Sequence, residues 1–306
     1  MSDLLDTPPT PSPAVRPAWH WGTREQLLAR IEHKRELVLA WLGAETFSTA
    51  KVLGQVLGLK KTGTHQTLAA MKRDGLIDFQ SIEWHAASLQ IVVLTPHGAA
   101  LAGTGGDGYQ QGKVASSSIG HQLDVQQARL YLERAGWSDW VAERTLREEA
   151  GAEEGDEALP VLQRRWLKVP DGVGLSPNSR RVAVEMERSI KTTKSYTTIV
   201  GQYLHMLERG VVDRVLYVTT SDRVRDALHA KVGALGIVNF PDGVKKLNSR
   251  RHLATKRREF EDAEKKKFWF ASVDDLQANR PPRHAAETAD EYRQRIERQP
   301  QQTAGA

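Results

Sequence analysis

The architecture of the C-terminal half follows from the strand predicted over residues 181–187, which read Arg181-Val-Ala-Val-Glu-Met-Glu187. Side chains of a β-strand alternate between its two faces, so Glu185 and Glu187 share one face while Val184 and Met186 share the other. Two acids on one face of an otherwise apolar strand are costly to bury without a counter-charge. This pattern predicts a strand whose acidic face holds either a cation or solvent-exposed ion pairs.

The residues around this strand alternate between helical and extended patterns. Apolar residues at helical spacing predict helices over residues 119–135, 192–208 and 222–235. Alternating or β-branched runs predict further strands over residues 137–144, 165–169, 214–220, 236–240 and 268–272. The acidic segment 143–157 is expected to form a solvated turn and the basic run 245–267 a helix. The order helix, three strands, helix, strand predicts an α/β domain over residues 119–276.

Three acidic residues form the candidate site of this domain. Asp171 lies in a Pro170-Asp171-Gly172 turn, which is predicted to connect the second and third strands. A hairpin would bring Asp171 to the end of the strand that carries Glu185 and Glu187. Carboxylates of this kind bind Mg²⁺ or Mn²⁺, which activates water and offsets charge on a phosphodiester oxygen. The alternative is that both glutamates lie on a solvent-exposed face and pair with nearby arginines.

The spacing Pro-Asp-x(13)-Glu-x-Glu, in this order of elements, resembles the core of restriction-endonuclease-like, or PD-(D/E)XK, nucleases. Flanking residues are similar to the replication-relaxation family, which includes the MobC-type relaxases of mobilisable plasmids. The residues concerned are Gly120-His121-Gln122-Leu123-Asp124, Pro170-Asp171-Gly172 and Val184-Glu-Met-Glu-Arg-Ser-Ile-Lys191, followed by Tyr196 and Tyr203. The similarity covers roughly residues 20–275. It implies a winged helix joined to a nuclease-like domain that acts with a divalent metal at a transfer origin.

Carried over by position, the resemblance implies catalytic roles for four residues. Asp171, Glu185 and Glu187 would be metal ligands, and Lys191 would contact a phosphate or water. The chain departs from the nuclease motif at Glu187, where the last position is usually lysine. Lys191 and Lys194, on the following helix, are candidates for the missing positive charge.

Other side chains of the resemblance have two interpretations. His121 and Asp124 lie three residues apart on one helix face. His121 is predicted to touch substrate or orient a ligand, or alternatively to pair with Asp124 at the start of the helix. Tyr196 and Tyr203 are candidates for a covalent link to DNA, but their helical stripe favours packing in the core.

Residues 23–103 predict a smaller N-terminal domain. Helical patterns over residues 24–42, 48–57 and 60–72 precede strands over 76–79 and 89–94 and a short helix over 97–102, with Ser48 as the cap of the second helix. This order is typical of a winged helix-turn-helix, whose third helix enters the major groove. The candidate base contacts are Thr64, His65 and Gln66, and the candidate phosphate contacts are Lys60, Lys61, Lys72 and Arg73. The alternative is a winged helix used for protein contact.

The composition excludes several classes of protein. The 306 residues include no cysteine, which excludes a disulfide scaffold, a thiolate zinc site and a cysteine nucleophile and fits a reducing cytoplasm. No apolar run approaches the roughly 18 residues of a membrane span. The net charge is +5, and residues 245–267 hold ten Lys or Arg against four acids. This run favours a polyanion such as DNA, with Arg250 and Arg251 as candidate contacts, or alternatively an exposed helix face.

The remaining segments are expected to lack regular structure. The Pro-rich residues 1–22 and the polar residues 277–306 are predicted to be disordered, apart from a short helix near Asp290. The Gly- and Ser-rich residues 104–118 are predicted to link the two domains.

Taken together, the residues and the resemblance predict a cytoplasmic, metal-dependent DNA-nicking relaxase. Its partners would be double-stranded DNA at an origin-like site and other mobilisation proteins, with a homodimer as an open option. One alternative is a non-catalytic DNA-binding accessory or regulator with an inactive nuclease-like fold. Another is a protein–protein adaptor, which would show no salt-dependent DNA binding.

Overall fold

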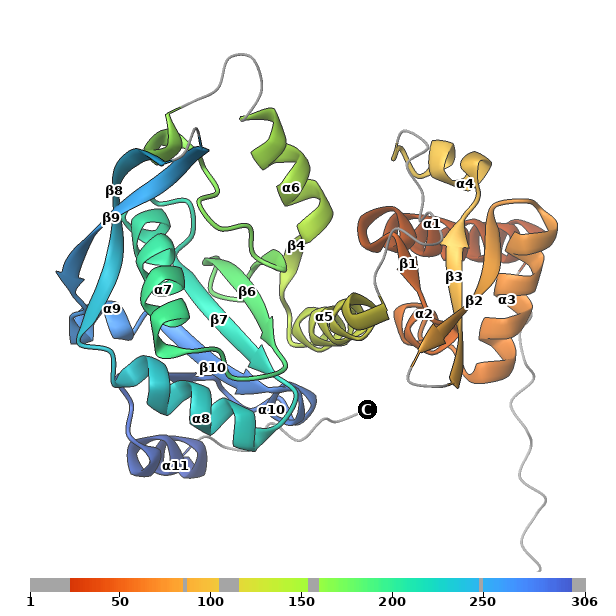
Figure 1. Cartoon of the computed structure of the whole chain (residues 1–306). Coiled ribbons are helices and arrows are strands. Elements are labelled where there is room, and N and C mark those ends of the chain that lie inside the picture. The colour runs from red at the N-terminus through yellow and green to blue at the C-terminus, as the bar shows by residue number, and fades with distance from the viewer. Residues whose placement is uncertain (1–22, 85–86, 105–115, 154–159, 248–249, 299–306) are drawn as a thin grey trace, which may run out of the picture.

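The computed structural model describes residues 23–84, 87–104, 116–153, 160–247 and 250–298 and shows a mixed α/β chain (Figure 1). In these residues the strands form sheets of three, six and two strands. The three-stranded sheet and its helices lie to the right in Figure 1, and the six-stranded sheet lies to the left. Residues 1–22 and 105–115, which include the predicted leader and most of the predicted linker, lie outside the described residues.

The N-terminal part contains the predicted helices and a longer hairpin than expected. Its elements are α1 (Arg24–Glu45), β1 (Phe47–Ser48), α2 (Ala50–Val56), α3 (Lys61–Arg73), β2 (Ile77–Trp84), β3 (Ala87–Leu94) and α4 (Pro96–Leu101). The strand order is β1-β3-β2, and both pairs are antiparallel. The N-cap of α2 is Thr49 rather than the predicted Ser48, which belongs to β1.

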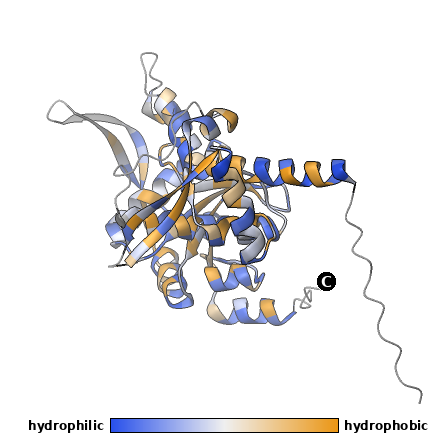
Figure 2. Cartoon of the chain, turned by 90° about the vertical axis from the view of Figure 1, so that its right-hand side faces the viewer, coloured by the Kyte–Doolittle hydropathy of each residue, from blue (hydrophilic) through white to orange (hydrophobic). Residues whose placement is uncertain are grey.

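Helix α1 begins at a capping box and then leaves the body of the protein. The Thr23 hydroxyl accepts from the Gln26 amide at 3.3 Å, and the Gln26 side chain accepts from the Thr23 amide at 3.1 Å. In Figure 2 this helix projects outward from the rest of the fold. Only its C-terminal turns are buried, at Val38, Trp41 and Leu42.

The six-stranded sheet has the order β11-β10-β7-β6-β5-β4. Strands β4 (Ser138–Ala142), β5 (Gly172–Leu175) and β6 (Arg181–Glu187) form an antiparallel series, and β6 pairs in parallel with β7 (Arg214–Thr219), which pairs in parallel with β10 (Phe268–Ser272). Apolar residues of α5 (Ser116–Arg134) and α10 (Val273–Gln277) cover one face, and those of α7 (Thr193–Glu208) and α8 (Asp222–Gly233) cover the other. Along the chain, α5 is followed by three antiparallel strands, a helix and a parallel strand, with an additional helix between the first two strands.

The segment between β4 and β5 differs from the prediction. Residues 143–152 form α6 (Glu143–Ala152) instead of a turn. Residues 165–169 form no strand, and the second strand of the series is β5, which begins directly after Asp171. The alternation of apolar residues in 165–169 has another cause. Trp166 is buried in the core and donates its indole N–H to Glu149 at 2.9 Å, so the segment covers one end of the sheet as an irregular stretch.

The basic run 245–267 is mostly a β-hairpin, so the prediction of a helix is wrong. Strands β8 (Ile237–Leu247) and β9 (Arg250–Glu259) pair antiparallel, and α9 (Asp262–Lys265) follows. Val238 and Phe240 are buried one strand period apart, which directs β8 against α7. A Cβ at Gly201 of α7 would lie 2.1 Å from the Asn239 carbonyl oxygen, so this glycine permits the close approach.

Much of the segment after residue 276 is ordered, contrary to the predicted disorder. Strand β11 (Arg283–His284) adds to the sheet beside β10, and α11 (Ala289–Arg298) follows near the predicted position. Polar contacts hold this segment in place. The Glu287 carboxylate pairs with Arg295 at 2.8 Å. The main-chain carbonyl of Glu287 accepts a hydrogen bond from the buried Arg283 guanidinium.

Helix α5 joins the two parts of the chain, and residues 116–118 of the predicted linker belong to it. Gln126 is fully buried and spans the junction by donating to the Phe47 carbonyl at 2.7 Å and accepting from the Ser48 hydroxyl at 2.7 Å. Arg129 pairs with Glu45 at 2.7 Å and lies over the Trp41 ring. Among the described residues no helix is both long enough and apolar enough to cross a membrane.

Candidate active site

The register of β5 and β6 brings Asp171 next to Glu185. Gly172 faces Val184 across this antiparallel pair, so the residue before Gly172 faces the residue after Val184. The Asp171 side chain also crosses to β6, where it accepts from the Met186 amide at 2.7 Å. Asp171 therefore lies at the predicted end of the strand, although the chain reaches it from an irregular segment.

Glu185 and Glu187 point to the α7 side of the sheet, while Val184 and Met186 pack in the core on the α5 side. The predicted division of faces is therefore confirmed. Glu185 is 4% exposed and Glu187 is 3% exposed, so the alternative of a solvent-exposed acidic face is wrong. We refer to Asp171, Glu185 and Glu187 as the carboxylate cluster.

Glu185 is held by a lysine and a tyrosine. Lys168 donates to Glu185 Oε1 at 2.5 Å, and the buried Tyr203 hydroxyl donates to the same oxygen. Burial raises the pKa of the Glu185 carboxyl, and the charge of Lys168 opposes this rise only in part. Burial together with the charge of Glu185 holds the pKa of Tyr203 well above its usual value.

Glu187, at the end of β6, has the corresponding pair of partners. Lys191 forms an ion pair with Glu187 Oε1, and the Tyr196 hydroxyl donates to Glu187 Oε2 at 3.4 Å. The Tyr196 oxygen also accepts from the Lys191 amide at 3.2 Å. Burial lowers the pKa of the Lys191 ammonium group. Tyr196 and Tyr203 are both 0% exposed, which confirms the prediction that their stripe packs in the core.

His121, in the second turn of α5, pairs with Asp171 rather than with Asp124. The distance from His121 Nε2 to Asp171 Oδ1 is 3.0 Å. This hydrogen bond raises the pKa of His121 although burial opposes the rise. Burial disfavours the charged form of Asp171, but the hydrogen bond and charge of His121 outweigh it and lower the pKa of Asp171. The environments of the neighbouring Asp171 and Glu185 thus shift their pKa values in opposite directions.

Asp124, one turn further along α5, pairs with Arg188. The distance from Arg188 Nε to Asp124 Oδ2 is 3.1 Å. A Cβ at Gly120 would lie 2.5 Å from Arg188 Nη1, so the absence of a side chain at Gly120 gives the guanidinium its place against α5. The alternative in which His121 pairs with Asp124 is therefore wrong, because the two side chains contact different partners.

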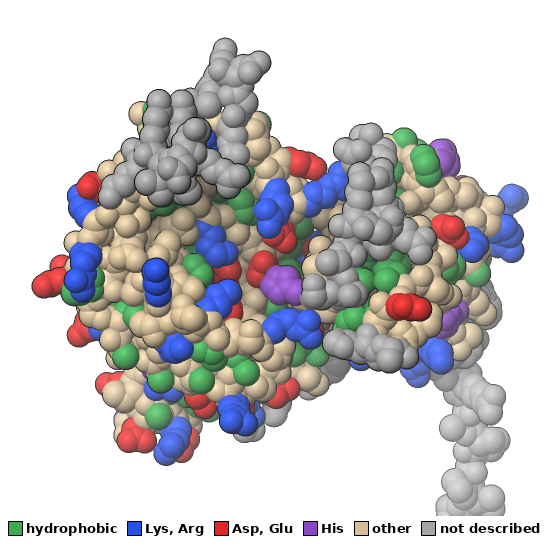
Figure 3. Space-filling view, viewed as in Figure 1, with side chains coloured by type: hydrophobic (Ala, Val, Ile, Leu, Met, Phe, Trp, Pro, Cys, Tyr) green, Lys and Arg blue, Asp and Glu red, His purple; other side chains and the backbone are tan. Residues whose placement is uncertain are grey.

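A second glycine determines how closely β4 packs beside Asp171. A Cβ at Gly172 would lie 2.2 Å from Cζ2 of Trp140 on β4. The Trp140 ring therefore covers the backbone directly after Asp171. On the face shown in Figure 3, a histidine side chain lies among acidic and basic side chains between the two parts of the chain.

Each acid of the carboxylate cluster contacts a basic side chain of the chain itself: His121, Lys168 or Lys191. In the described part of the chain, no three His, Cys, Asp or Glu side chains form a group arranged to hold a metal ion. The carboxylate oxygens are of the chemical type that Mg²⁺ and Mn²⁺ prefer. An ion would have to displace the lysine ammonium groups from Glu185 and Glu187.

Lys168, which contacts Glu185, is not among the site residues predicted from the sequence. Its backbone falls in the segment 165–169, which alternation had assigned to a strand, and its side chain reaches Glu185 from outside the sheet. One signal was present in the sequence. Lys168 is the only charged residue among Trp166, Leu167 and Val169, three positions before Asp171. A lone charge in an apolar segment needs a partner, and a buried acid is the suitable one.

The predicted DNA contacts divide into exposed and buried residues. Thr64 is 2% exposed, donates to the Lys60 carbonyl at 3.1 Å and lies against Gly54, so its prediction as a base contact is wrong. The other residues predicted in and beside α3 are exposed: Lys60, Lys61, His65, Gln66, Lys72 and Arg73. Lys72 pairs with Asp78 at 2.8 Å.

The contacts predicted in the C-terminal half lie on two elements. Lys194 is exposed in the first turn of α7. The backbones of Arg250 and Arg251 belong to β9, and their side chains lie outside the described residues.

No family model, curated protein or solved structure matches the chain in comparisons with known proteins.

Proposed function

We propose that this protein is a DNA-nicking endonuclease of the relaxase type, acting at a transfer origin. The observation that carries the proposal is the carboxylate cluster. It comprises three acids at neighbouring ends of two paired strands, two of them almost fully buried, with two lysines in contact. Burying three carboxylates in one place is unfavourable for folding. Such strongly perturbed groups concentrate at functional sites.

The topology around the cluster supports a nuclease-like core. Apart from the additional helix α6 between β4 and β5, the series α5, β4, β5, β6, α7, β7 is compatible with the order expected of a restriction-endonuclease-like domain. Asp171 and Glu185 occupy the positions that the resemblance assigns to the first two acids. Lys168 supplies a positive charge beside Glu185, which compensates for the presence of Glu187 where that motif usually has lysine.

We further propose that a divalent metal, Mg²⁺ or Mn²⁺, binds at Asp171, Glu185 and Glu187. When bound, the metal would activate a water molecule and offset charge on the phosphodiester. The chain's own residues have separate parts in this proposal. His121 keeps Asp171 ionised, as the lowered pKa of Asp171 indicates, and Lys191 is a half-exposed cation that a phosphate can reach.

The proposal assigns duplex binding to the N-terminal part, acting as a winged helix. The support is the exposed row of polar and basic side chains on α3, which includes Lys61, His65, Gln66 and Arg73. Helix α3 lies on the side of the N-terminal part that faces away from the large sheet (Figure 1). Basic side chains in such a row neutralise phosphates and release counterions. Other mobilisation proteins and a second copy of the chain are the partners proposed with it.

The decisive experiment is a nicking assay on supercoiled plasmid carrying the candidate origin, with Mg²⁺, Mn²⁺ or EDTA. The wild type is expected to open the plasmid only with metal, whereas Asp171→Asn and Glu185→Gln leave it closed. Glu148→Gln, on exposed α6, is the matched control and should nick like the wild type. An intact plasmid with the wild type, or equal nicking by Asp171→Asn, would refute the proposal.

Metal binding has a test that does not depend on activity. A ligand that binds only the folded state stabilises it by about 2.7 kcal/mol at a hundredfold excess over its dissociation constant. Mn²⁺ should therefore raise the thermal midpoint of the wild type but not that of the Asp171→Asn variant. Equal midpoints with and without Mn²⁺ in the wild type would remove the metal from the proposal.

A non-catalytic DNA-binding accessory is the second candidate, and the charge balance of the cluster favours it. Lys168 and Lys191 neutralise Glu185 and Glu187 without an added ion, and His121 does the same for Asp171 when its imidazole is protonated. The accessory would bind duplex DNA with a steep dependence on salt and would leave the plasmid closed. In both cases Lys61→Ala should lower the slope of log affinity against log salt by about 1. An unchanged slope would argue against α3 as the docking element.

A further inference from the structure

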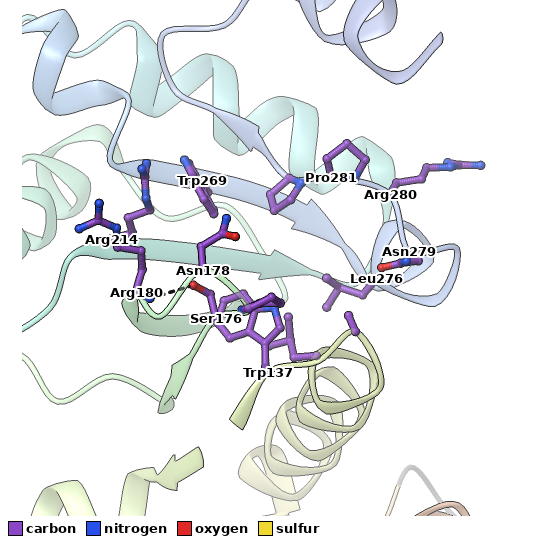
Figure 4. A pocket seen from close by; sticks show the side chains of 14 residues that line it. Trp137, Ser176, Asn178, Arg180, Arg214, Trp269, Leu276, Asn279, Arg280 and Pro281 are labelled. Carbon is purple, nitrogen blue, oxygen red and sulfur yellow. Dashed lines mark hydrogen bonds between the residues drawn. The ribbon is translucent and has the colours of Figure 1, made fainter. Parts of the chain in front are cut away.

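A cavity lies away from the carboxylate cluster, at the end of the large sheet where β6 and β7 begin. Its volume is about 520 Å³. The walls come from the residue before β4 (Trp137), the turn between β5 and β6 (Asn178, Arg180), the starts of β7 and β10 (Arg214, Trp269) and the segment after α10 (Figure 4). We refer to this cavity as the arginine pocket. The volume is within the range of about 300–1,000 Å³ that is usual for small-molecule sites.

The charge of the arginine pocket is entirely positive. Arg180, Arg214 and Arg280 are the charged residues among those that line it, and no acid lines it. The nearest acids give little compensation, since Arg180 lies 3.8 Å from Asp213 and Arg280 lies 3.6 Å from an Asp275 that is already paired with Arg225. Burial and the charge of Arg180 together lower the pKa of Arg214. An anion placed here would relieve the repulsion between the two arginines.

Aromatic surface lies directly beside this charge. The Arg214 guanidinium lies over the Trp269 ring at 4.4 Å, and the Trp269 indole N–H is fixed by the Lys266 carbonyl at 3.0 Å. Trp137 lines the other side of the pocket together with Leu276 (Figure 4). The half-buried Trp137 ring, and the planar Arg214 guanidinium that covers one face of Trp269, offer flat surfaces on which a planar ring can stack.

The pocket also contains a side-chain amide, that of Asn178, which is available for hydrogen bonds with a ligand. The Asn178 side chain extends between Trp269 and Ser176 in Figure 4. Within the part of the chain that the structure describes, the Asn178 amide has no hydrogen-bond partner. A side-chain amide both donates and accepts, which is the pattern needed to meet the edge of a nucleobase.

We propose that the arginine pocket binds a nucleotide unit. The base stacks on the tryptophan surface, the Asn178 amide meets its polar edge, and Arg180 and Arg214 hold the phosphate. Arginine suits this role because its planar fork forms paired, charge-assisted hydrogen bonds with phosphate. Stacking of bases on aromatic side chains is the general way in which proteins hold unpaired nucleotides. Two sources share this chemistry: a free nucleotide and an unpaired nucleotide of a single DNA strand.

This site is separate from the carboxylate cluster. Strand β6 begins at Arg181, beside the pocket, and ends at Glu187, roughly 20 Å away at the usual rise of a strand. The two sites also lie on opposite faces of the sheet, because Trp269 packs on the α5 side while Glu185 and Glu187 face α7. The inference does not depend on the proposed nuclease activity.

Equilibrium binding to the full chain tests this inference. Fluorescence anisotropy would follow a labelled ten-nucleotide single-stranded DNA, with dAMP and inorganic phosphate as unlabelled competitors. The double variant Arg180→Ala/Arg214→Ala should bind the strand about tenfold or more weakly, because it loses charge-assisted hydrogen bonds. Arg223→Ala, which removes one exposed arginine of α8 outside the pocket, should stay within about twofold of the wild type.

The competitors identify the source and the chemistry. If dAMP competes as well as an unlabelled strand, the pocket takes free nucleotides, and if only the strand competes, it takes a unit of single-stranded DNA. Trp269→Phe keeps every charge and should weaken binding by a smaller factor through reduced stacking. Equal binding by the double variant, or competition by inorganic phosphate as strong as by dAMP, would overturn the inference. Asp171→Asn should bind normally, which separates this result from the fate of the nuclease proposal.

Discussion

The carboxylate cluster and the arginine pocket lie at opposite ends of β6 and differ in how far their charged side chains are compensated by neighbouring charges. In the cluster each acid contacts a basic side chain, and two of the acids are almost fully buried. In the pocket the arginines face no lining acid and remain partly exposed. Removing one partner of a buried pair leaves an uncompensated buried charge, whereas removing an exposed charge that has only a weak ion pair leaves its partner in contact with water. The cluster is therefore tied to the stability of the fold, and the pocket is not.

The largest expected effect is that of Lys168→Ala. The variant leaves the buried Glu185 with only the Tyr203 hydroxyl, so the free energy of unfolding should fall by about 3 kcal/mol at pH 7. Urea denaturation measures this change. Lys194→Ala, on exposed α7 surface, should stay within about 0.5 kcal/mol of the wild type. Adding Glu185→Gln to Lys168→Ala should recover much of the loss, and no recovery would contradict the pairing.

A smaller loss is expected for Gly172→Ala, which tests the packing beside the cluster. The new Cβ would require the Trp140 ring to move, and overpacking of this kind costs about 2 kcal/mol. Gly151→Ala is the matched control, because no atom lies within 4 Å of a Cβ at Gly151 in α6. Helix propensity makes the control neutral or slightly stabilising. Equal urea midpoints for the two variants would show that Trp140 does not restrict this position.

The pair of His121 and Asp171 should make stability depend on pH. The folded-state pKa of His121 is raised, so its contribution is complete below the unfolded value of about 6.5 and is lost as the pH rises through the folded value. The charges of Glu143 and Glu185 act in the same direction. We expect the wild type to lose about 1 kcal/mol relative to His121→Gln between pH 6 and pH 9.

The lowered pKa of Asp171 acts in a different range of pH. Its contribution is present above the unfolded value of about 3.9 and is lost as the pH falls through the folded value. Urea curves at pH 5, 7 and 9 measure the contribution of His121 without interference from Asp171. A difference between the wild type and His121→Gln that stays constant over this range would count against the ion pair.

The smallest expected effect is that of Arg180→Ala in the arginine pocket. Its side chain is 58% exposed and forms only a long, exposed ion pair with Asp213 at 3.8 Å, so the free energy of unfolding should change by less than about 0.5 kcal/mol. A thermal melt measures this beside the binding titration. Unchanged stability together with weakened nucleotide binding would show that Arg180 serves the pocket, whereas Lys168 stabilises the fold. A large loss of stability would place Arg180 among the residues that hold the fold.

The features that could be predicted from the sequence were those with a strict local period. The alternation of Val184, Glu185, Met186 and Glu187 predicted both faces of β6 correctly, because one face of each strand must meet a core. Helical spacing likewise located α7 and α8. The same rule failed at residues 165–169. Trp166 enters the core from an irregular segment there, so apolar and polar residues alternate although the segment pairs with no strand that the structure describes.

Two predictions that were based on charged and polar composition are wrong: the helix over residues 245–267 and the disorder after residue 276. The many lysines and arginines of residues 245–267 suggested an exposed helix, but the buried Val238 and Phe240 had already begun a strand that continues into a hairpin. The polar tail is ordered by contacts such as Glu287 with Arg295, which composition alone does not reveal. The pairing of His121 with Asp171 is also beyond local pattern, since it joins residues fifty positions apart in the sequence.

Helix α5 has a consequence for how the protein can be divided. Its Leu130 belongs to the core of the N-terminal part, while its Leu132 belongs to the core of the large sheet. Ile119 of the same helix packs with Phe47, Ile91 and Val93 of the small sheet. A fragment that ends before this helix would leave those apolar residues in water and invite aggregation. The smallest N-terminal fragment that keeps its apolar contacts therefore includes α5, and the large sheet needs the same helix to cover one of its faces.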